Sequence, residues 1–333
     1  MMDRERFKMP GRMYKADGCE RRVGVEIEMS GIDLEVIAQT VVDVIGGLLV
    51  KRSPYEYEVK ETPLGKFKVE LDMEYLTKYG RERLSPEMNK ASELELIASD
   101  ALGALAMNIV PCELVSPPIE LSSLAKLDDL VDALQRKGAK GTRESMFFAF
   151  GVHLNPELPN LEGLTILNYL KAFLCLCDWL VDNEDVALSR KLSPFIRPFS
   201  SDYIELVLDS RYQPSVSTLI DDYLEANPTR NKIMDMLPLF AHLDEARVLA
   251  VIGHQKLRKR PTLHYRLPNS DIDCEGWGIW KSWNDWWQVE ALANDPERLA
   301  EVCKGYFYNH KLLSKELMTP WKEKVTTWLI DQT

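Results

Sequence analysis

The chain has 333 residues, of which 45% are hydrophobic and 28% are charged, and its formal net charge is −11. This length suits one large domain or two closely associated ones, and the acidic balance argues against nucleic acid or an anionic membrane as a partner. The six cysteines follow neither zinc-ligand spacing nor a disulfide framework, and Met1 to Lys15 lack the apolar run of a signal peptide. We therefore expect a cytoplasmic protein with free thiols.

Residues 1–20 indicate an irregular lead-in, and the first predicted strand follows directly. In residues 22–29, apolar side chains alternate with Gly24, Glu26 and Glu28. The two carboxylates project from one face of this strand, roughly 6–7 Å apart. They repel each other unless water screens them or a cation lies between them, and Mg²⁺ favours such oxygen ligands. The strand is therefore either an edge strand with a solvated acidic face or part of a Mg²⁺ site.

The rest of the N-terminal half alternates short strands with helices. Residues 66–72 form the return strand of a hairpin whose polar face carries Glu70 and Asp72. Residues 75–90 indicate a loop or a broken helix. The other predicted elements are helices over 33–45, 93–107 and 122–137, and strands over 48–52, 55–60, 111–116 and 145–155. This order indicates an α+β fold with a curved, mainly antiparallel sheet.

From about residue 160 onward, helices dominate. They are predicted over 161–182, 184–190, 216–226, 243–250, 278–293, 296–304 and 312–330. The apolar stretch 161–181 contains Asn168 and Asp178, so we expect a buried helix and no membrane span. One strand, 261–268, interrupts the helices. It follows a basic run whose last residue, Arg260, we expect at the surface.

The sequence lacks a Gly-rich phosphate loop, a dinucleotide fingerprint and a G-x-S-x-G elbow. Single polar residues interrupt apolar strands instead. Glu113 lies in such a strand just before a double proline, where a buried carboxylate needs an arginine or a metal ion as its partner. His153 lies two residues before Asn155, and His264 two residues before Arg266, so each pair shares a strand face. A lone histidine in this setting is usually a hydrogen-bonded core residue, which is the alternative to a role in a site.

These polar residues would form one site if their strands were neighbours. The acids are Glu26, Glu28, Glu70, Asp72 and Glu113, and the complementary residues are His153, Asn155, His264 and Arg266. Without bound cations, the carboxylates on such a face would repel one another. About two Mg²⁺ ions and a triphosphate would neutralise it, which is the physical logic of a phosphoryl-transfer site without a P-loop.

Four short segments carry a family resemblance. They are residues 24–28 (Gly-Val-Glu-Ile-Glu), 113–118 (Glu-Leu-Val-Ser-Pro-Pro), 151–155 (Gly-Val-His-Leu-Asn) and 262–266 (Thr-Leu-His-Tyr-Arg). In this order they resemble the amidoligase family of the carboxylate–amine ligase superfamily, which includes glutamine synthetase and glutamate–cysteine ligase. The resemblance spans residues 22 to about 270. It implies that residues 21–333 form a single catalytic domain, in which a curved antiparallel sheet makes an open funnel ringed by helices.

The resemblance also implies a reaction. ATP phosphorylates a carboxylate to an acyl phosphate, and an amine then attacks to give an amide or peptide-like bond. The carboxylate would belong to an amino acid, a peptide or a cell-surface polymer, and the amine would be free or be ammonia from a partner glutaminase. Two alternatives remain. One is a binding or scaffold module that has lost turnover, and the other is a nucleotidyl- or phosphotransferase that uses the same metals.

By motif position, the resemblance assigns Mg²⁺ to Glu26, Glu28 and Glu113. Asp72 would hold or orient a second ion, and Glu70 is a further candidate for this role. These five carboxylates are the metal ligands that we expect.

The resemblance implies that residues of the later strands bind the nucleotide. His153 would contact a phosphate, with Asn155 beside it, and Arg266 would neutralise the γ-phosphate as it transfers. Many relatives have an acid where this chain has His264. That difference leaves one metal ligand in doubt and gives His264 a phosphate or substrate contact instead. Arg230 could reach a substrate carboxylate or phosphate, or it could be a solvated residue of a helix-ending turn.

Overall fold

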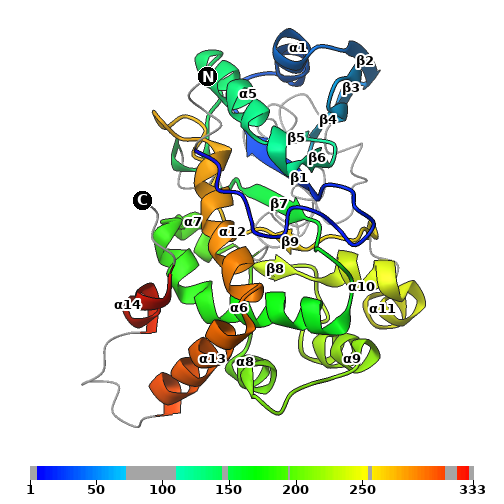
Figure 1. Cartoon of the computed structure of the whole chain (residues 1–333). Coiled ribbons are helices and arrows are strands. Elements are labelled where there is room, and N and C mark those ends of the chain that lie inside the picture. Colours follow the sequence, from blue (N-terminus) through cyan, green and yellow to red (C-terminus); the bar gives the residue numbers. More distant parts are fainter. Residues whose placement is uncertain are drawn as a thin grey trace, which may run out of the picture.

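The computed structural model describes residues 6–72, 110–144, 149–193, 196–253, 257–311 and 321–329. Within these residues, an open sheet of nine strands runs through the middle of the molecule, and helices lie around it (Figure 1). The strand order is β2-β3-β4-β5-β1-β7-β9-β8, and β6 pairs with β1. All of these ladders are antiparallel. The expectation of an α+β fold built on a mainly antiparallel sheet is confirmed.

The elements have the following bounds. The strands are β1 (Arg22–Met29), β2 (Leu48–Ser53), β3 (Glu56–Thr62), β4 (Gly65–Leu71), β5 (Cys112–Val115), β6 (Ile119–Glu120), β7 (Val152–Pro156), β8 (Met234–Asp235) and β9 (His264–Tyr265). The helices are α1 (Leu34–Ile45), α5 (Ala125–Arg136), α6 (Gly163–Asn183), α7 (Leu188–Lys191), α8 (Ser201–Leu208), α9 (Val216–Ala226), α10 (Leu237–Leu243), α11 (Glu245–Ile252), α12 (Ile279–Ala293), α13 (Pro296–Lys311) and α14 (Trp321–Val325).

β1 lies near the centre of the sheet, with β5 on one side and β7 on the other. Its side chains Val23, Val25 and Ile27 are buried in the core, while Glu26 and Glu28 alternate with them on the opposite face. Burying each aliphatic side chain contributes about 1.5–3 kcal/mol. A slip of one residue would exchange the two faces, so this burial fixes the register of the strand.

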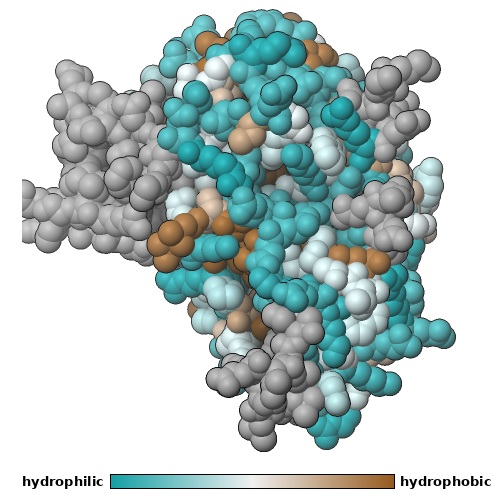
Figure 2. Space-filling view, turned by 90° about the vertical axis from the view of Figure 1, so that its left-hand side faces the viewer, coloured by the Kyte–Doolittle hydropathy of each residue, from teal (hydrophilic) through white to brown (hydrophobic). Residues whose placement is uncertain are grey.

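Helices cover the apolar side of the sheet. α12 packs against α6 and α5, and α1 packs against β3 and β4. By length and composition α6 could cross a membrane, but 67% of its most apolar window is buried inside the protein, as is typical of a core helix. The face of the molecule shown in Figure 2 is mostly hydrophilic, and its hydrophobic groups form small separate patches.

A buried ion pair joins the start of β1 to α12. Arg21 Nη2 lies 2.6 Å from Glu290 Oε1, and both residues are fully buried. Tyr169 of α6 donates a hydrogen bond to Glu290 Oε2 at 2.5 Å, and Trp286 Nε1 donates to Oε1 at 3.1 Å. The acidic strand is thereby fixed to the two main core helices.

Several expected boundaries are wrong. Of the strand expected over 145–155, residues 145–148 lie outside the described residues, and the described part begins at Val152. The helix expected over 184–190 is reduced to α7. Asp185 takes a left-handed backbone (φ 46°) directly after α6, which prevents the chain from continuing as a helix. The strand expected over 261–268 contains only β9, because its backbone bonds change partner: Leu263 N donates to Pro156 O, and Arg266 N to Ile233 O.

Other elements were not expected at all, namely α8, α10, β6 and β8. The predicted loop at 75–90 and the predicted helix at 93–107 lie outside the described residues, as do parts of the predicted helix at 312–330.

Candidate active site

Three neighbouring strands bring carboxylates into one row on the polar face of the sheet. Glu28 of β1 is opposite Glu113 of β5, and Glu113 is in turn opposite Glu70 of β4. Like charges that face each other directly on a sheet are destabilising. The carboxylates of this row therefore repel one another and do not stabilise the fold.

Glu113 is the least compensated member of this row. Within the described part of the chain, no side chain forms a hydrogen bond or an ion pair with its carboxylate. Burial, followed by the charges of Glu26, Asp72 and Glu28, raises the pKa of Glu113 well above its usual value. Of the two partners expected for Glu113, an arginine is thus absent from the described residues.

Glu28 is buried beside the same charges. Burial, and then the charge of Asp72, raises the pKa of Glu28 to about 7. The Gly151 N–H donates a hydrogen bond to Glu28 Oε2 at 2.7 Å and so holds one oxygen of the carboxylate in place. The other oxygen, Oε1, points toward His153.

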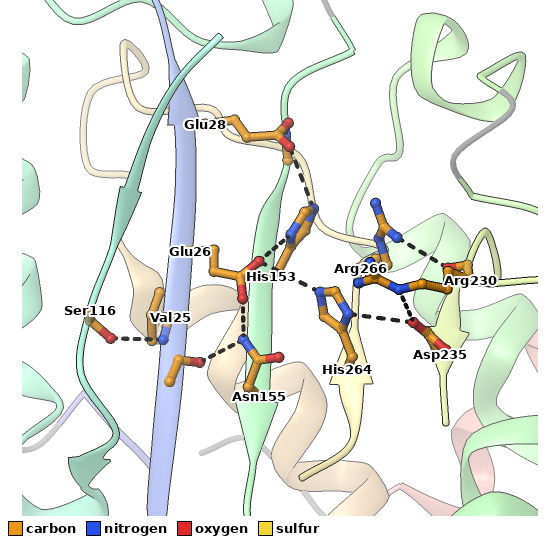
Figure 3. Close-up of polar contacts among 12 residues, drawn as sticks. Val25, Glu26, Glu28, Ser116, His153, Asn155, Arg230, Asp235, His264 and Arg266 are labelled. Carbon is orange, nitrogen blue, oxygen red and sulfur yellow. Dashed lines mark hydrogen bonds and ion pairs between the residues drawn. The ribbon is translucent and has the colours of Figure 1, made fainter. Parts of the chain in front are cut away.

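His153 stands between the two carboxylates of β1 (Figure 3). Its Nδ1 lies 3.0 Å from Glu26 Oε2, and its Nε2 lies 3.7 Å from Glu28 Oε1. Burial lowers the pKa of His153 to about 3, so the ring is neutral. A neutral ring that donates from Nδ1 to Glu26 keeps a lone pair on Nε2, on the side of Glu28.

Two groups of side chains converge closely enough to hold a cation. One consists of Glu28, Glu113 and His153, and the other of Glu26, His153 and His264. Within each group the ligand atoms lie within 4.8 Å of one another. Carboxylate oxygens and an imidazole nitrogen are ligands for divalent cations, so this donor set fits the predicted metal site.

Glu26 is surrounded by donors. Asn155 Nδ2 donates to Glu26 Oε1 at 3.0 Å, Arg260 Nη2 lies 3.4 Å from the same oxygen, and His264 Nε2 lies 3.6 Å from Oε2. Burial would raise the pKa of Glu26, but the hydrogen bonds of His153 and His264 and the charge of Arg260 hold it well below its usual value. Glu26 is therefore ionised, and it orients the groups around it.

The other half of the site contains three basic side chains, from His264 of β9, from Arg266 just after it and from Arg230 in the loop before β8 (Figure 3). Arg266 Nη1 donates to Arg230 O at 3.1 Å. Arg230 Nε lies 3.5 Å from Asp235 Oδ2, and His264 Nδ1 lies 3.8 Å from the same oxygen. Asp235 is fully buried and is opposite His264 in the β8–β9 ladder. This carboxylate thus positions two of the basic side chains.

The backbone at Gly151 lies close to the Arg190 side chain. A Cβ at Gly151 would lie 2.4 Å from Arg190 Nη1, so a larger residue would displace the guanidinium. Arg190 donates to Ala149 O at 2.7 Å and to Arg266 O at 2.5 Å. It therefore links α7 to the start of β7 and to the end of β9.

The structure gathers the expected residues around one face of the sheet. Glu70, at the end of the acidic row, is paired with Lys68 at 2.5 Å. The solvated alternative for Arg230 is wrong, because only 16% of its side chain is exposed. Arg260, expected at the surface, has 29% of its side chain exposed, but its Nη2 also reaches into the site and donates to Asn155 Oδ1 at 2.5 Å.

Sequence reasoning missed Asp235 and Arg190. Asp235 lies in a strand of two residues, which is too short to produce a periodic pattern. The only signal for Arg190 was indirect, namely the need for a glycine at position 151.

Comparison with known proteins gives one match. The sequence model of a family described as "putative amidoligase enzyme" matches residues 19–288, which include every residue of the site. Searches of curated proteins and of solved structures found no match.

Proposed function

This chain belongs to the amidoligase family, and on that premise we propose that it is an ATP- and Mg²⁺-dependent ligase that joins a carboxylate to an amine. In the first step a carboxylate oxygen attacks the γ-phosphorus of ATP, the bond to ADP breaks, and an acyl phosphate forms. In the second step the amine attacks the acyl carbon, phosphate leaves, and the nitrogen loses a proton to give the amide.

One observation carries the proposal: an acidic row and a basic group share one face of the sheet. Glu28 and Glu113 face each other in the β1–β5 ladder, and no described basic side chain pairs with Glu113. His264 and Arg266 lie across from Glu28, beyond His153 (Figure 3). An enzyme that transfers a phosphoryl group needs this combination, because cations must bind the acids while fixed positive groups bind the phosphates. A module that only binds protein partners has no need to concentrate buried charge in this way.

The residues present fit Mg²⁺. We assign one ion to Glu28, Glu113 and His153, whose ligand atoms converge. When bound, Mg²⁺ would neutralise the charge of the triphosphate and polarise the transferring phosphoryl group. Asp72, whose charge acts on both Glu28 and Glu113, is the proposed ligand of a second ion.

Two further carboxylates, Glu26 and Glu70, are secondary candidates for metal ligands. Glu26 completes the second converging group, with His153 and His264. Glu70 is an outer candidate, because Lys68 already neutralises it.

The basic residues bind the nucleotide in this proposal. Arg266 neutralises the γ-phosphoryl group, and His264 contacts a phosphate or the substrate. Asn155 and Arg230 contribute further contacts. Asp235 and the Arg230 carbonyl hold His264 and Arg266 before the nucleotide arrives, which lowers the cost of reorganisation during the reaction.

The proposed partners are a small-molecule or peptide carboxylate and an amine, or ammonia from a partner glutaminase. The proposed location is the cytoplasm. The free state of all six cysteines supports it, since exposed thiols persist in a reducing compartment.

Hydroxylamine trapping tests the reaction without knowledge of the natural amine. The protein is incubated with ATP, Mg²⁺ and a panel of amino acids, short peptides and dicarboxylates, with hydroxylamine as the nucleophile. We expect one class of carboxylate to yield a hydroxamate together with an equal amount of ADP. Glu28→Gln should abolish both products, and Glu120→Gln, an exposed acid of β6, should retain them.

Three other results would each contradict the proposal. Release of AMP would indicate a nucleotidyltransferase, and a stable phosphorylated product without hydroxamate would indicate a phosphotransferase. Binding of Mg²⁺-ATP without any turnover across the panel would favour the inactive binding module.

A further inference from the structure

A polar cavity lies between the end of α6 and the first turns of α12, away from the candidate active site. It has a volume of about 260 Å³ and is lined by residues that include Glu184, Asp271, Trp277 and Asp285. Tyr265 separates it from the candidate active site: the Tyr265 hydroxyl donates to Glu184 Oε1 at 3.3 Å, whereas the neighbouring His264 faces Glu26. We call it the α6–α12 cavity.

Two carboxylates in this cavity lack a cationic partner. Asp285 is only 6% exposed, and both of its oxygens accept from Asn183 Nδ2 at 2.8 Å. Glu184 accepts from the Ser282 hydroxyl at 3.1 Å and from Tyr265. These donors are neutral, and no lysine, arginine or histidine within the described ranges pairs with either acid.

The two acids also affect each other. Burial, and then the charge of Asp285, raises the pKa of Glu184 well above its usual value, and burial raises the pKa of Asp285 to about 6. In the chain described, only neutral groups contact these two acids, so a bound cation would supply the counter-charge that favours their ionised forms.

Asp271, a third acid, also lines this cavity. Asp271 is 8% exposed, and its Oδ1 has no hydrogen-bond partner among the described residues, whereas its Oδ2 is paired with Arg143 at 3.0 Å. Trp277, which is 8% exposed, supplies an aromatic wall. A buried acceptor without a donor and an aromatic face are both features of sites that bind organic cations.

A metal ion does not suit this arrangement. Within the described residues, the only groups of His, Cys, Asp or Glu that converge on one point are the two at the candidate active site. In the α6–α12 cavity, no three such ligand atoms of the described residues lie within 4.8 Å of one another. A cation with several N–H donors distributed over an organic skeleton would match both the spacing and the volume.

We propose that the α6–α12 cavity binds a small organic cation that carries an ammonium or guanidinium group. Its N–H groups donate to Asp285, Glu184 and Asp271 Oδ1, and its carbon skeleton packs against Trp277. The proposal does not depend on the ligase reaction, because the cavity shares no lining residue with the candidate active site.

Binding can be tested with agmatine, which carries one ammonium and one guanidinium group. It is titrated into the full-length protein, without ATP or Mg²⁺, by isothermal calorimetry and by tryptophan fluorescence. We expect saturable binding with a Kd below about 1 mM. N-butylurea, which has a similar shape and no charge, should not bind at the same concentrations.

Three variants locate the site. Asp285→Asn and Asp271→Asn should each weaken agmatine binding at least ~10-fold, because each removes one charge-assisted hydrogen bond. Both are nearly isosteric, and circular dichroism and the melting temperature show whether each variant is folded. If one fails to fold, the other still locates the site. Glu28→Gln, which alters only the candidate active site, should bind agmatine as tightly as the wild type.

The proposal is overturned if agmatine does not bind, or if N-butylurea binds equally well. It is also overturned if Glu28→Gln weakens agmatine binding while the folded Asp285 and Asp271 variants do not. That last pattern would place the cation at the ligase site, and it would leave the proposed ligase function intact.

Discussion

Glu28 and Glu113 face each other across the β1–β5 ladder, and of the two only Glu28 receives a hydrogen bond from the described backbone, from the Gly151 N–H. One strand thus presents a carboxylate that is held in position, and the neighbouring strand presents one that nothing described holds. A bound cation would supply the missing partner. The first two predictions concern this site.

Glu28→Gln should weaken Mg²⁺-ATP binding at least ~10-fold, because a direct metal ligand matters at least as much as the outer groups whose loss costs 10–100-fold. The variant should be no less stable than the wild type without Mg²⁺, since it removes a buried charge whose pKa is raised by burial. Calorimetric titration and thermal melting measure the two effects. Unchanged Mg²⁺-ATP affinity would rule out Glu28 as a metal ligand.

Arg260→Ala should reduce ATP turnover by ~10–100-fold, because Arg260 helps to orient Glu26 and Asn155. Arg258→Ala is the matched control, since Arg258 is exposed in the same basic segment. Steady-state kinetics in saturating ATP distinguish the two variants. Equal rates in both would mean that the basic segment acts only as surface charge.

Glu290→Gln should lower the free energy of unfolding by about 3–5 kcal/mol, because it leaves the buried Arg21 guanidinium without its counter-ion. Glu297→Gln, on the exposed face of α13, should change it by less than about 0.5 kcal/mol. Denaturant titration followed by tryptophan fluorescence gives both values. A loss below about 1 kcal/mol for Glu290→Gln would mean that the ion pair does not anchor β1.

Asp285→Asn should alter how stability depends on pH. The folded protein raises the pKa of Asp285 from 3.8 to about 6, so it binds this proton more tightly than the unfolded chain does. The protonated Asp285 stabilises the folded wild type. This contribution to the free energy of unfolding is complete below about pH 4 and is lost as the pH rises through about 6. The stability of Asp285→Asn relative to wild type should therefore increase over this range, by about 3 kcal/mol at most.

Melting curves at intervals between pH 4 and 8 measure this difference. The exposed Asp129→Asn should give a curve parallel to that of the wild type. A constant difference between Asp285→Asn and wild type at every pH would contradict the raised pKa.

The alternation in residues 22–29 was sufficient to predict β1, its buried face and the shared direction of Glu26 and Glu28. A strand with one apolar face has only one register that buries its aliphatic side chains, so this information is local. Glu113, His153 and Arg266 were also found in the sequence, because a charged or polar residue inside an apolar strand is conspicuous wherever that strand lies.

The sequence could not show which of these residues would meet. Antiparallel pairing across β4, β5, β1 and β7 decided that Glu28 faces Glu113 and that His153 contacts Glu26. The packing of loops and helices against the sheet brought Arg260 into the site and formed the α6–α12 cavity around Asp285. Such contacts join residues more than 80 positions apart, and their geometry depends on strand register and helix packing, which no local pattern encodes.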